Sequence, residues 1–368
     1  MFVSTGEASG ELAAVELAAA MRTIEPELAF EGIGAQRMRD AGFALRWDTR
    51  GWASLGPIEA LAKIPKLLAL NLITAAELRA RPPSLVVLID FGAVNLRLAR
   101  QLRRTGYAGP ICYYFPPAAW LDDAKRARMV ARACVAVTPF AHQRDFYASL
   151  GLPIHHFGHP LVSTIPERPP RPRPAPDGGR IAILPGSRRG ELERHALLLF
   201  EAARLLRIHR PRAEFVIGAA DDEAEHRLAG LARAFTELPV RMIRGARAAL
   251  DDADAAWIAS GTAVLEAALL GVPTVALYIV SRMQERMARR LVKRASLKYL
   301  TLPNLVLDAP VVPELWQEQV TQISLVDALE RVLEDTDGQR ASFAQLRAAL
   351  GPPDALGRTA AFAVELAR

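Results

Sequence analysis

Residues 181–191 read IAILPGSRRGE and place an apolar run, a glycine-rich turn and a helix start in direct succession. The run at 181–184 predicts a strand buried on both faces, and residues 191–209 predict the helix that follows it. Downstream the alternation continues, with strands predicted at 214–217, 255–258 and 274–278 and a helix at 262–270. Strands that alternate with helices are typical of a parallel sheet that is covered by helices on both faces.

A similar alternation precedes this stretch. Residues 85–90 (LVVLID) form a continuous apolar run that ends on Asp90, and residues 95–104 predict a helix. Further strands are predicted at 111–115 and 133–138. The two halves therefore predict an α/β protein of two Rossmann-like domains that face each other across a cleft. Ligands of such sheets bind at the carboxyl ends of the strands.

The composition changes between the two halves. Six of the eleven residues 166–176 are proline, and Asp177-Gly178-Gly179 follows. Since proline fixes φ and lacks an amide hydrogen, residues 166–179 are predicted to be a stiff, exposed linker. The expected division is a first domain at 1–165, a second domain at 180–340, and a C-terminal helix at 341–368 that packs back onto the first.

The composition limits the class of protein. The chain has 368 residues, of which 51% are hydrophobic and 23% charged, so it can fill two cores and is not disordered. Its net charge of +6 favours anionic partners such as phosphorylated small molecules, acidic lipid headgroups or nucleic acid. Cys112 and Cys134 lie in apolar runs without metal or redox spacing, which predicts buried free thiols in a reducing cytoplasm. Because the chain starts directly with Met1, Phe2 and Val3, and no apolar stretch reaches about 18 residues, we expect neither a signal peptide nor a transmembrane span.

The loop at 184–191 (LPGSRRGE) has the chemistry of a phosphate site. Gly186 lets the backbone approach a ligand closely, the helix start offers amide hydrogens, and Arg188 can grip a phosphate through two donors. The loop lacks the Lys-Ser/Thr pair of a P-loop, and an ordinary turn with solvated arginines remains an alternative.

A second loop of this kind lies at 260–266 (SGTAVLE). Gly261 and Thr262 could hold another phosphate edge, and Glu266 could accept hydrogen bonds from both hydroxyls of a ribose. The alternative for Glu266 is an acid that stabilises the helix dipole. Two phosphate-type loops on one sheet, with an acid nearby, indicate a nucleoside diphosphate.

The first half offers weaker signals. Residues 6–10 (GEASG) form a glycine-rich turn that differs from the dinucleotide pattern, so a nicotinamide enzyme is disfavoured. Asp90 ends a strand, where partial desolvation can raise its pKa toward that of a general base, although it could also cap the next turn. His155, His156 and His159 lack partners at ligand spacing, so packing is favoured over metal binding.

Two segments suggest a membrane surface. Residues 61–72 place leucines near one helical face beside Lys63 and Lys66, with a regular helix expected to begin at Pro65. Residues 282–298 carry seven basic residues against one acid. Basic amphipathic helices can lie in the headgroup layer of an acidic bilayer, but each segment also fits a helix on the protein surface. Aromatic residues are not interleaved with these charges, so nucleic acid is the weaker partner.

Several motifs occur in order along nearly the whole chain. They are GEASGE (6–11), LGPIEAL (55–61), NLRLAR (95–100), GHPL (158–161), LPGSRRGE (184–191), SGTAVLEAALLGVP (260–273), RRLVK (289–293), LPN (302–304) and VPELWQE (312–318). In these motifs the chain resembles the lipid-A-disaccharide synthase family, which are inverting glycosyltransferases of the GT-B type. The resemblance implies transfer of diacylglucosamine from UDP-2,3-diacylglucosamine to 2,3-diacylglucosamine 1-phosphate (lipid X), with release of UDP. The resemblance also implies that the protein is a peripheral membrane protein at the cytoplasmic face of the inner membrane.

The resemblance assigns roles by position. Asp90 becomes the base that deprotonates the acceptor 6-hydroxyl, and Arg188 becomes the partner of the departing diphosphate. The UDP site would be lined by Gly186, Ser187, Arg188, Gly261, Thr262, Glu266, Asn304 and Gln317, and the acceptor side by Glu7, Ser9 and Asn95. No metal or other cofactor and no nucleic acid are expected, since arginine and helix ends can neutralise the leaving group. The sequence leaves open whether the protein forms a homodimer.

Two stretches depart from the family pattern. After the strand-end acid the family continues Ala-Pro-Asp-Phe-Asn, whereas residues 91–95 of this chain read FGAVN, without the second acid. A Trp-Ala-Trp-Arg stretch is expected further on, but Trp120 is followed by Leu-Asp-Asp. Both departures fall in the acceptor half, so a different membrane acceptor remains an alternative. The other alternative is a non-catalytic relative that binds UDP-sugar or membrane. The presence of both Asp90 and Arg188 argues against it.

Overall fold

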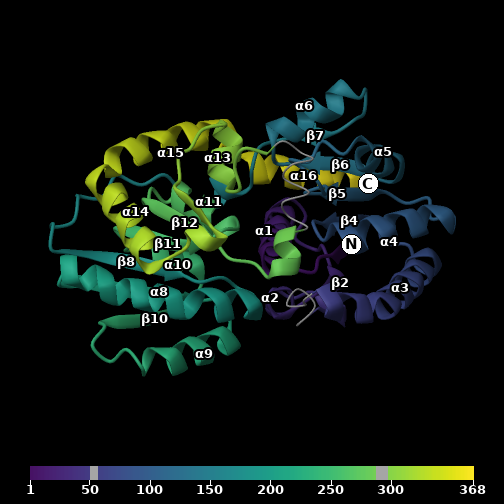
Figure 1. The fold of residues 1–368 in the computed structure, drawn as a ribbon. Coiled ribbons are helices and arrows are strands. Elements are labelled where there is room, and N and C mark those ends of the chain that lie inside the picture. Colours follow the sequence, from purple (N-terminus) through teal and green to yellow (C-terminus); the bar gives the residue numbers. More distant parts are fainter. Residues whose placement is uncertain (50–56, 287–296) are drawn as a thin grey trace. The chain divides into compact units, whose positions relative to one another are not determined.

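The computed structural model describes residues 1–49, 57–286 and 297–368 (Figure 1). The chain divides into two compact units. Unit 1 consists of Met1–Thr164 together with Leu350–Arg368, and unit 2 consists of Ile165–Ala349. Each unit contains one parallel sheet with helices on both faces, which confirms the predicted α/β class with two Rossmann-like domains.

The sheet of unit 1 has seven parallel strands in the order β3-β2-β1-β4-β5-β6-β7. The strands are β1 (Phe2–Ser4), β2 (Glu31–Gly34), β3 (Ala44–Asp48), β4 (Val86–Ile89), β5 (Ile111–Tyr114), β6 (Val135–Thr138) and β7 (His155–His156). The central strands are buried throughout, as their continuous apolar runs require. The strand order reverses between β1 and β4, and such a switch point opens a crevice at the carboxyl edge.

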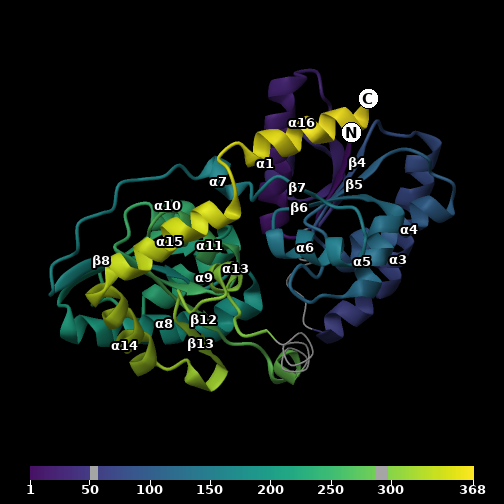
Figure 2. The same cartoon turned by 90° about the horizontal axis from the view of Figure 1, so that it is seen from above.

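Two helical layers cover this sheet. One layer comprises α3 (Pro57–Ala80), α4 (Gly92–Arg104), α5 (Ala124–Ala133) and α6 (Ala141–Ser149), and the other comprises α1 (Ala8–Ile24), α2 (Gln36–Asp40) and α16 (Ala355–Ala367). Figure 2 shows α16 from the end of the chain lying against α1 from its beginning. A short helix, α7 (Leu161–Thr164), ends the first part of the unit.

The sheet of unit 2 has six parallel strands in the order β10-β9-β8-β11-β12-β13. The strands are β8 (Gly178–Leu184), β9 (Arg212–Ala219), β10 (Val240–Arg244), β11 (Ala255–Ala259), β12 (Thr274–Tyr278) and β13 (Glu314–Trp316). The order reverses between β8 and β11. The glycine-rich loops after these two strands therefore leave the sheet at its switch point.

The main core of unit 2 lies under α8 (Arg189–His209), α9 (Asp222–Ala232) and α14 (Gln322–Glu334). Its largest fully buried side chain is Trp257, whose Nε1 donates to the Leu325 carbonyl oxygen at 3.0 Å. On the other face α10 (Ala246–Leu250) packs on Gly218 and contacts α11 (Thr262–Leu269). Unit 2 also contains α13 (Leu302–Leu307), η1 (Gln317–Gln319) and α15 (Thr336–Leu350), and residues 282–286 are helical.

Some details differ from the sequence-based expectations. The helix α3 begins at Pro57, so Pro65 lies inside it and does not start it. The proline-rich stretch has exposed backbone, but Arg168 pairs with Asp251 at 2.5 Å and Arg173 donates to the Leu333 carbonyl at 2.9 Å. These contacts fasten the stretch to unit 2. No helix in the described part of the chain is long and apolar enough to cross a membrane.

The two cysteines are free and buried, as predicted. Burial raises the pKa of both the Cys112 and the Cys134 thiol to about 12. Both thiols are therefore protonated at neutral pH and have little nucleophilic character.

Candidate functional site

In unit 2 the two predicted phosphate loops start from neighbouring strands. The register between β8 and β11 pairs Leu184 with Ile258, so the loop at 185–188 and the loop at 260–261 begin at the same edge of the sheet. Each loop leads into a helix, α8 or α11, whose N-terminus points its amide hydrogens toward this edge. The geometry of an anion site is thus present at the switch point of the second sheet.

The loop before α8 already holds an anion from its own helix. The Glu191 carboxylate accepts hydrogen bonds from the Ser187 amide at 3.1 Å and from the Arg188 amide at 3.2 Å. The Arg188 guanidinium also donates to Glu191 at 3.0 Å. Gly186 adopts a φ of +114°, and a Cβ there would lie 2.6 Å from the Glu191 carboxylate. The sequence predicted the amides and the arginine as phosphate ligands, but it did not predict that Glu191 would bind to both.

The N-terminus of α11 is open by comparison. Gly261 occupies the N-cap in extended conformation, is exposed, and provides no side chain that could cap the helix. The first residue of α11, Thr262, is half-buried. The first-turn amides of α11 can therefore donate to an external anion more directly than those at the start of α8, where the Ser187 and Arg188 amides donate to Glu191.

Glu266 lies one turn into α11 and is only 6% exposed. Its Oε1 accepts a hydrogen bond from Arg247 Nε of α10 at 2.6 Å. A carboxylate has two oxygens that accept hydrogen bonds, so Oε2 can accept from a ligand hydroxyl while Oε1 pairs with Arg247.

Asn304 and Gln317 are buried and fully engaged within unit 2. The Asn304 amide donates to Val312 O at 2.8 Å, and its Oδ1 accepts from the Val312 amide at 2.8 Å. Gln317 Oε1 accepts from the Val280 amide at 2.7 Å, and its Nε2 donates to Glu285 at 2.8 Å. The two amides predicted to touch UDP thus hold neighbouring backbone in place.

Glu314 links the segments around Asn304. Its Oε1 accepts from the Thr301 amide and hydroxyl, each at 2.7 Å, and from Asn304 Nδ2 at 3.0 Å. This carboxylate was not named as a site residue from the sequence. The signal that could have found it was its place inside the VPELWQE motif.

In unit 1 the predicted base lies on a tight corner after β4. Asp90 is exposed, with φ +45°, and Phe91 follows with φ +50°. Asn95 is completely buried and supports this corner, because its Nδ2 lies 3.0 Å from Asp90 O, 3.1 Å from Ile89 O and 3.0 Å from Ser4 O. The Ser4 hydroxyl donates to Asn95 Oδ1 at 2.7 Å. Asn95 therefore connects the ends of β1 and β4 at the switch point and can act on an acceptor only through Asp90.

The corner also packs on the glycine-rich turn after β1. A Cβ on Gly6 would lie 2.6 Å from the Phe91 ring, so any other residue there would displace this ring. Glu7 is the N-cap residue of α1, and Ser9 in the first turn is exposed. The residues predicted for the acceptor side thus lie at one switch point, with Asn95 beneath them.

The histidines near the linker are packed side chains. His159 is buried, its Nδ1 accepts from the Leu161 amide at 3.2 Å, and burial lowers its pKa to about 3. The His155 ring packs on Phe362, with 4.2 Å between ring centroids. No group of three or more His, Cys, Asp or Glu side chains suited to a metal ion occurs among the described residues.

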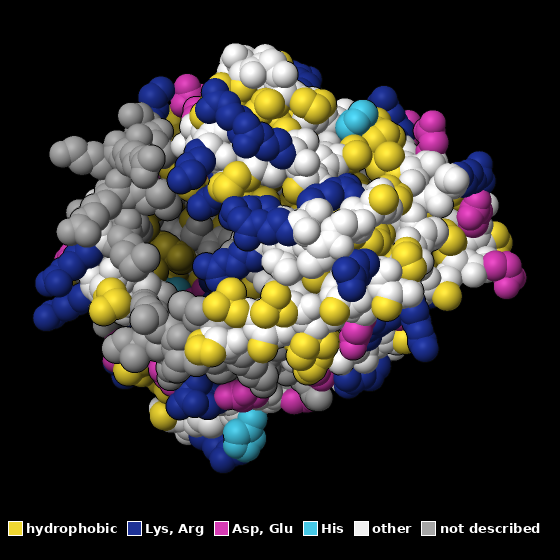
Figure 3. All heavy atoms as spheres, turned by 90° about the vertical axis from the view of Figure 1, so that its right-hand side faces the viewer, with side chains coloured by type: hydrophobic (Ala, Val, Ile, Leu, Met, Phe, Trp, Pro, Cys, Tyr) yellow, Lys and Arg dark blue, Asp and Glu magenta, His cyan; other side chains and the backbone are white. Residues whose placement is uncertain are grey.

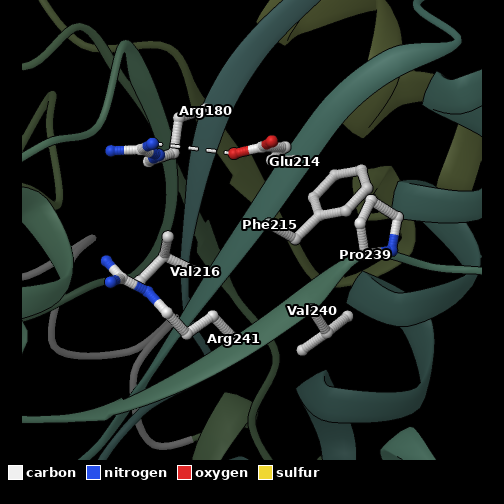
Figure 4. Close-up of a pocket in the computed structure, with 7 residues that line it drawn as sticks. All are labelled: Arg180, Glu214, Phe215, Val216, Pro239, Val240 and Arg241. Atoms are coloured by element: carbon white, nitrogen blue, oxygen red, sulfur yellow. Dashed lines mark ion pairs between the residues drawn. The ribbon is translucent and has the colours of Figure 1, made fainter.

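A cavity of about 400 Å³ lies elsewhere on the second sheet (Figure 4). It is lined by Arg180, Glu214, Phe215, Val216, Pro239, Val240 and Arg241. These residues lie near the start of β8, in the middle of β9 and at the start of β10, which Pro239 directly precedes, and not in the glycine-rich loops. Since ligands of such sheets bind at the carboxyl ends, we do not assign the candidate site to this cavity.

Parts of the predicted membrane segments lie outside the described residues. This holds for residues 287–296, which include all of RRLVK, and for the side chains of residues 57–64 and of Lys66. In the described part of α3, Leu67 is half-buried, whereas Leu68 and Leu72 are exposed by 44% and 56%.

Comparison with known proteins identifies the relatives of this chain. A family model described as lipid-A-disaccharide synthetase matches residues 1–350. The lipid-A-disaccharide synthase of Azotobacter vinelandii is 35% identical, over 98% of this chain and 96% of that protein. The enzymes of the same name from Myxococcus xanthus and Pseudomonas aeruginosa are 32% and 33% identical, over 100% and 94% of this chain and 97% and 92% of their own lengths.

Solved structures share the fold at low sequence identity. The S. aureus MnaA–UDP co-structure aligns with a TM-score of 0.65 and 11% identity, over 97% of this chain and 94% of that one. The spinosyn rhamnosyltransferase SpnG aligns with a TM-score of 0.57 and 16% identity, over 97% of this chain and 98% of that one. These likenesses show a GT-B fold.

Proposed function

Since this chain belongs to the lipid-A-disaccharide synthase family, we propose that it joins the diacylglucosamine of UDP-2,3-diacylglucosamine to lipid X. The products are lipid A disaccharide 1-phosphate and UDP. The observation that carries the proposal is the match over residues 1–350, which includes both phosphate-type loops of unit 2 and the strand-end acid of unit 1.

The donor is assigned to the switch point of unit 2. The diphosphate binds at the open N-terminus of α11 and at the loop before α8, where Arg188 exchanges its contact with Glu191 for one with phosphate. Glu266 accepts from the ribose hydroxyls through the oxygen that Arg247 leaves available. Asn304, Glu314 and Gln317 act by holding the surrounding backbone.

Asp90 is assigned as the general base. Its carboxylate takes the proton of the acceptor 6-hydroxyl while that oxygen attacks C1 of the donor sugar. The bond from C1 to the diphosphate oxygen breaks, and UDP leaves with the electron pair. Arg188 and the helix ends stabilise the charge that develops on the diphosphate. Direct displacement at C1 inverts its configuration.

Mass spectrometry of the products tests this function. Purified protein with both diacylated substrates is expected to give the tetraacylated disaccharide 1-phosphate and UDP in equal amounts. UDP release only with a different lipid acceptor would favour the alternative that residues 91–95 and 120–123 suggest. UDP binding without any sugar transfer would favour the non-catalytic alternative.

We further propose that unit 1 binds an anionic bilayer surface through α3, α4 and α5, because both substrates carry acyl chains. Leu68, Leu72 and Ile73 form an exposed apolar ridge on α3, each at least 44% exposed. The neighbouring helices α4 and α5 contain no acidic residue. Their exposed cations are Arg97, Arg100, Arg104, Lys125, Arg128 and Arg132. Figure 3, which faces the side where these helices lie in Figure 1, shows Lys and Arg side chains beside hydrophobic ones.

Each cation close to an anionic surface contributes about 1 kcal/mol, and the attraction decays over about 8 Å at physiological salt. We therefore expect Arg97→Gln, Arg100→Gln and Arg104→Gln together to reduce co-sedimentation with phosphatidylglycerol vesicles mainly at low salt. The pair Leu68→Ser and Leu72→Ser should reduce it at high salt as well.

Two exposed apolar side chains of unit 2 provide the control. Ile208 and Ile323 are 74% and 64% exposed, and replacing both with serine should leave vesicle binding unchanged. If neither unit 1 variant binds less than the wild type, this surface does not dock on the membrane.

A further inference from the structure

His195 lies in α8 beneath the glycine-rich loop and is completely buried. Its Nδ1 is 2.8 Å from the Pro185 carbonyl oxygen, and its Nε2 is 3.1 Å from the Ile279 amide nitrogen and 3.2 Å from the Ile279 carbonyl oxygen. Burial lowers the pKa of His195 and so favours the neutral ring, which carries one hydrogen. We assign this hydrogen to Nδ1, which makes the shortest contact, so that Nδ1 donates to Pro185 and Nε2 accepts from the Ile279 amide.

The two groups that His195 binds belong to two different loops of the donor site. Pro185 begins the loop that presents the Ser187 and Arg188 amides, and Ile279 directly follows β12. The next residue, Val280, donates its amide to Gln317 at 2.7 Å. One imidazole thus connects the loop after β8 to the segment after β12 and, through it, to the start of η1.

We propose that His195 is a positioning residue that holds the loop at 185–188, here called the diphosphate loop, in the geometry that binds phosphate. This inference rests on the proposed UDP site. The direction of the Pro185 carbonyl fixes the orientation of the peptide between Pro185 and Gly186. This orientation in turn sets the directions in which the amide hydrogens of Ser187 and Arg188 point. Without the imidazole, the Pro185 carbonyl and the Ile279 amide lose their buried partner, and the loop can rotate away from the direction in which phosphate binds.

A purely stabilising role for His195 makes a different prediction, and Gln339 provides the matched control. Gln339 is also buried, and it also bridges backbone of β12, but at the opposite end of that strand. Its Oε1 accepts from the Thr274 amide at 2.6 Å, and its Nε2 donates to Thr274 O at 3.1 Å. Replacing either residue with leucine removes a comparable set of hydrogen bonds, but only His195 touches the diphosphate loop.

The experiment is calorimetric titration of the whole protein with UDP, together with thermal unfolding. His195→Leu is expected to raise the Kd for UDP about tenfold or more, because the unpaired groups and the displaced amides both weaken phosphate binding. Gln339→Leu is expected to lower the melting temperature without changing the Kd. His195→Asn, whose Nδ2 replaces Nδ1 as donor to Pro185, is expected to stay within about threefold of the wild type.

The outcomes separate the two proposals. Wild-type protein that does not bind UDP contradicts the proposed function. Wild-type protein that binds UDP, with an unchanged Kd in His195→Leu, overturns the role of His195. An equal loss in Gln339→Leu also overturns it, since the effect would then follow from stability. If His195→Leu does not fold, His195→Gln is measured in its place. This variant keeps an acceptor for the Ile279 amide but loses the donor to the Pro185 carbonyl. An unchanged Kd for UDP in His195→Gln overturns the inference.

Discussion

Replacing Asn95 with alanine should lower turnover about 10- to 100-fold while leaving UDP affinity unchanged. Asn95 is fully buried in unit 1, and its amide is the only side chain described that bonds both Ser4 and the Asp90 carbonyl. The variant deletes the bond from the Ser4 hydroxyl at 2.7 Å. It also deletes the two amide hydrogens that three carbonyl oxygens share at 3.0 to 3.1 Å.

Three such hydrogen bonds contribute about 1 kcal/mol each, so the free energy of unfolding should fall by about 3 kcal/mol. The effect on turnover has a second cause. Asp90 and Phe91 both have positive φ, which is unfavourable by about 1–2 kcal/mol per residue. In the variant the Tyr113 hydroxyl still donates to Asp90 O at 2.9 Å, but the bonds from Asn95 to Ser4, Ile89 and Asp90 are lost, so the corner relaxes in part. A displacement of about 1 Å in a reacting group can reduce the rate about 10²-fold.

Three measurements check this reasoning: disaccharide formation under saturating substrates, calorimetry with UDP, and urea unfolding. Asn71→Ala is the control. Asn71 is also a buried asparagine that contacts α4, but its Nδ2 makes a single hydrogen bond among the described residues, to Val94 O at 3.3 Å. It should lose less stability and retain its turnover. Turnover of Asn95→Ala within twofold of the wild type would refute the argument, as would an equal loss in Asn71→Ala.

Three further variants test other parts of the proposal. Asp90→Asn should lower turnover about 10²-fold or more with UDP binding intact, and near-normal turnover would remove Asp90 from the mechanism. Arg188→Ala should weaken UDP binding about 10- to 150-fold, whereas Arg189→Ala, the neighbour that pairs with Glu193 at 2.8 Å, should bind normally; calorimetry compares them. His159 has its pKa lowered to about 3 by burial, so the folded state resists protonation and loses stability as the pH falls below about 6.5. Between pH 7 and pH 5 this loss is about 2 kcal/mol, and His159→Asn should be less acid-sensitive by that amount in urea unfolding.

The sequence predicted the fold where apolar runs are continuous. β4, β5, β8, β11 and β12 are all buried central strands, and each lies within two or three residues of its predicted bounds. β2, β3, β7, β10 and β13 were not predicted. β3 and β10 are half-exposed edge strands, and the two glycines in β2 (EGIG) interrupt its apolar run, so these strands lack the pattern that identifies a buried strand.

The site was predictable as a set of loops but not as a set of contacts. Glycines and an arginine between a strand and a helix indicate an anion site, and both loops follow the carboxyl ends of neighbouring strands. The sequence could not show that the Glu191 carboxylate already occupies one set of amides. It also could not show that Asn304 and Gln317 are buried, since amide side chains look alike whether they bind ligand or backbone. His195 gave no signal because a single histidine in an amphipathic helix fits the solvated face equally well.

Unit 1 cannot complete its core until α16 (Ala355–Ala367) has been synthesised. Helix α1 forms from residues 8–24, but its apolar side shares a core with Leu356, Ala360 and Val364 of α16. Unit 2 is continuous in sequence and is finished earlier. The two parts of unit 1 are separated by Ile165–Ala349, which are 185 residues and take about 10–40 s to make at about 5–20 residues per second. During that time the apolar side of α1 lacks the helix that covers it in the finished unit.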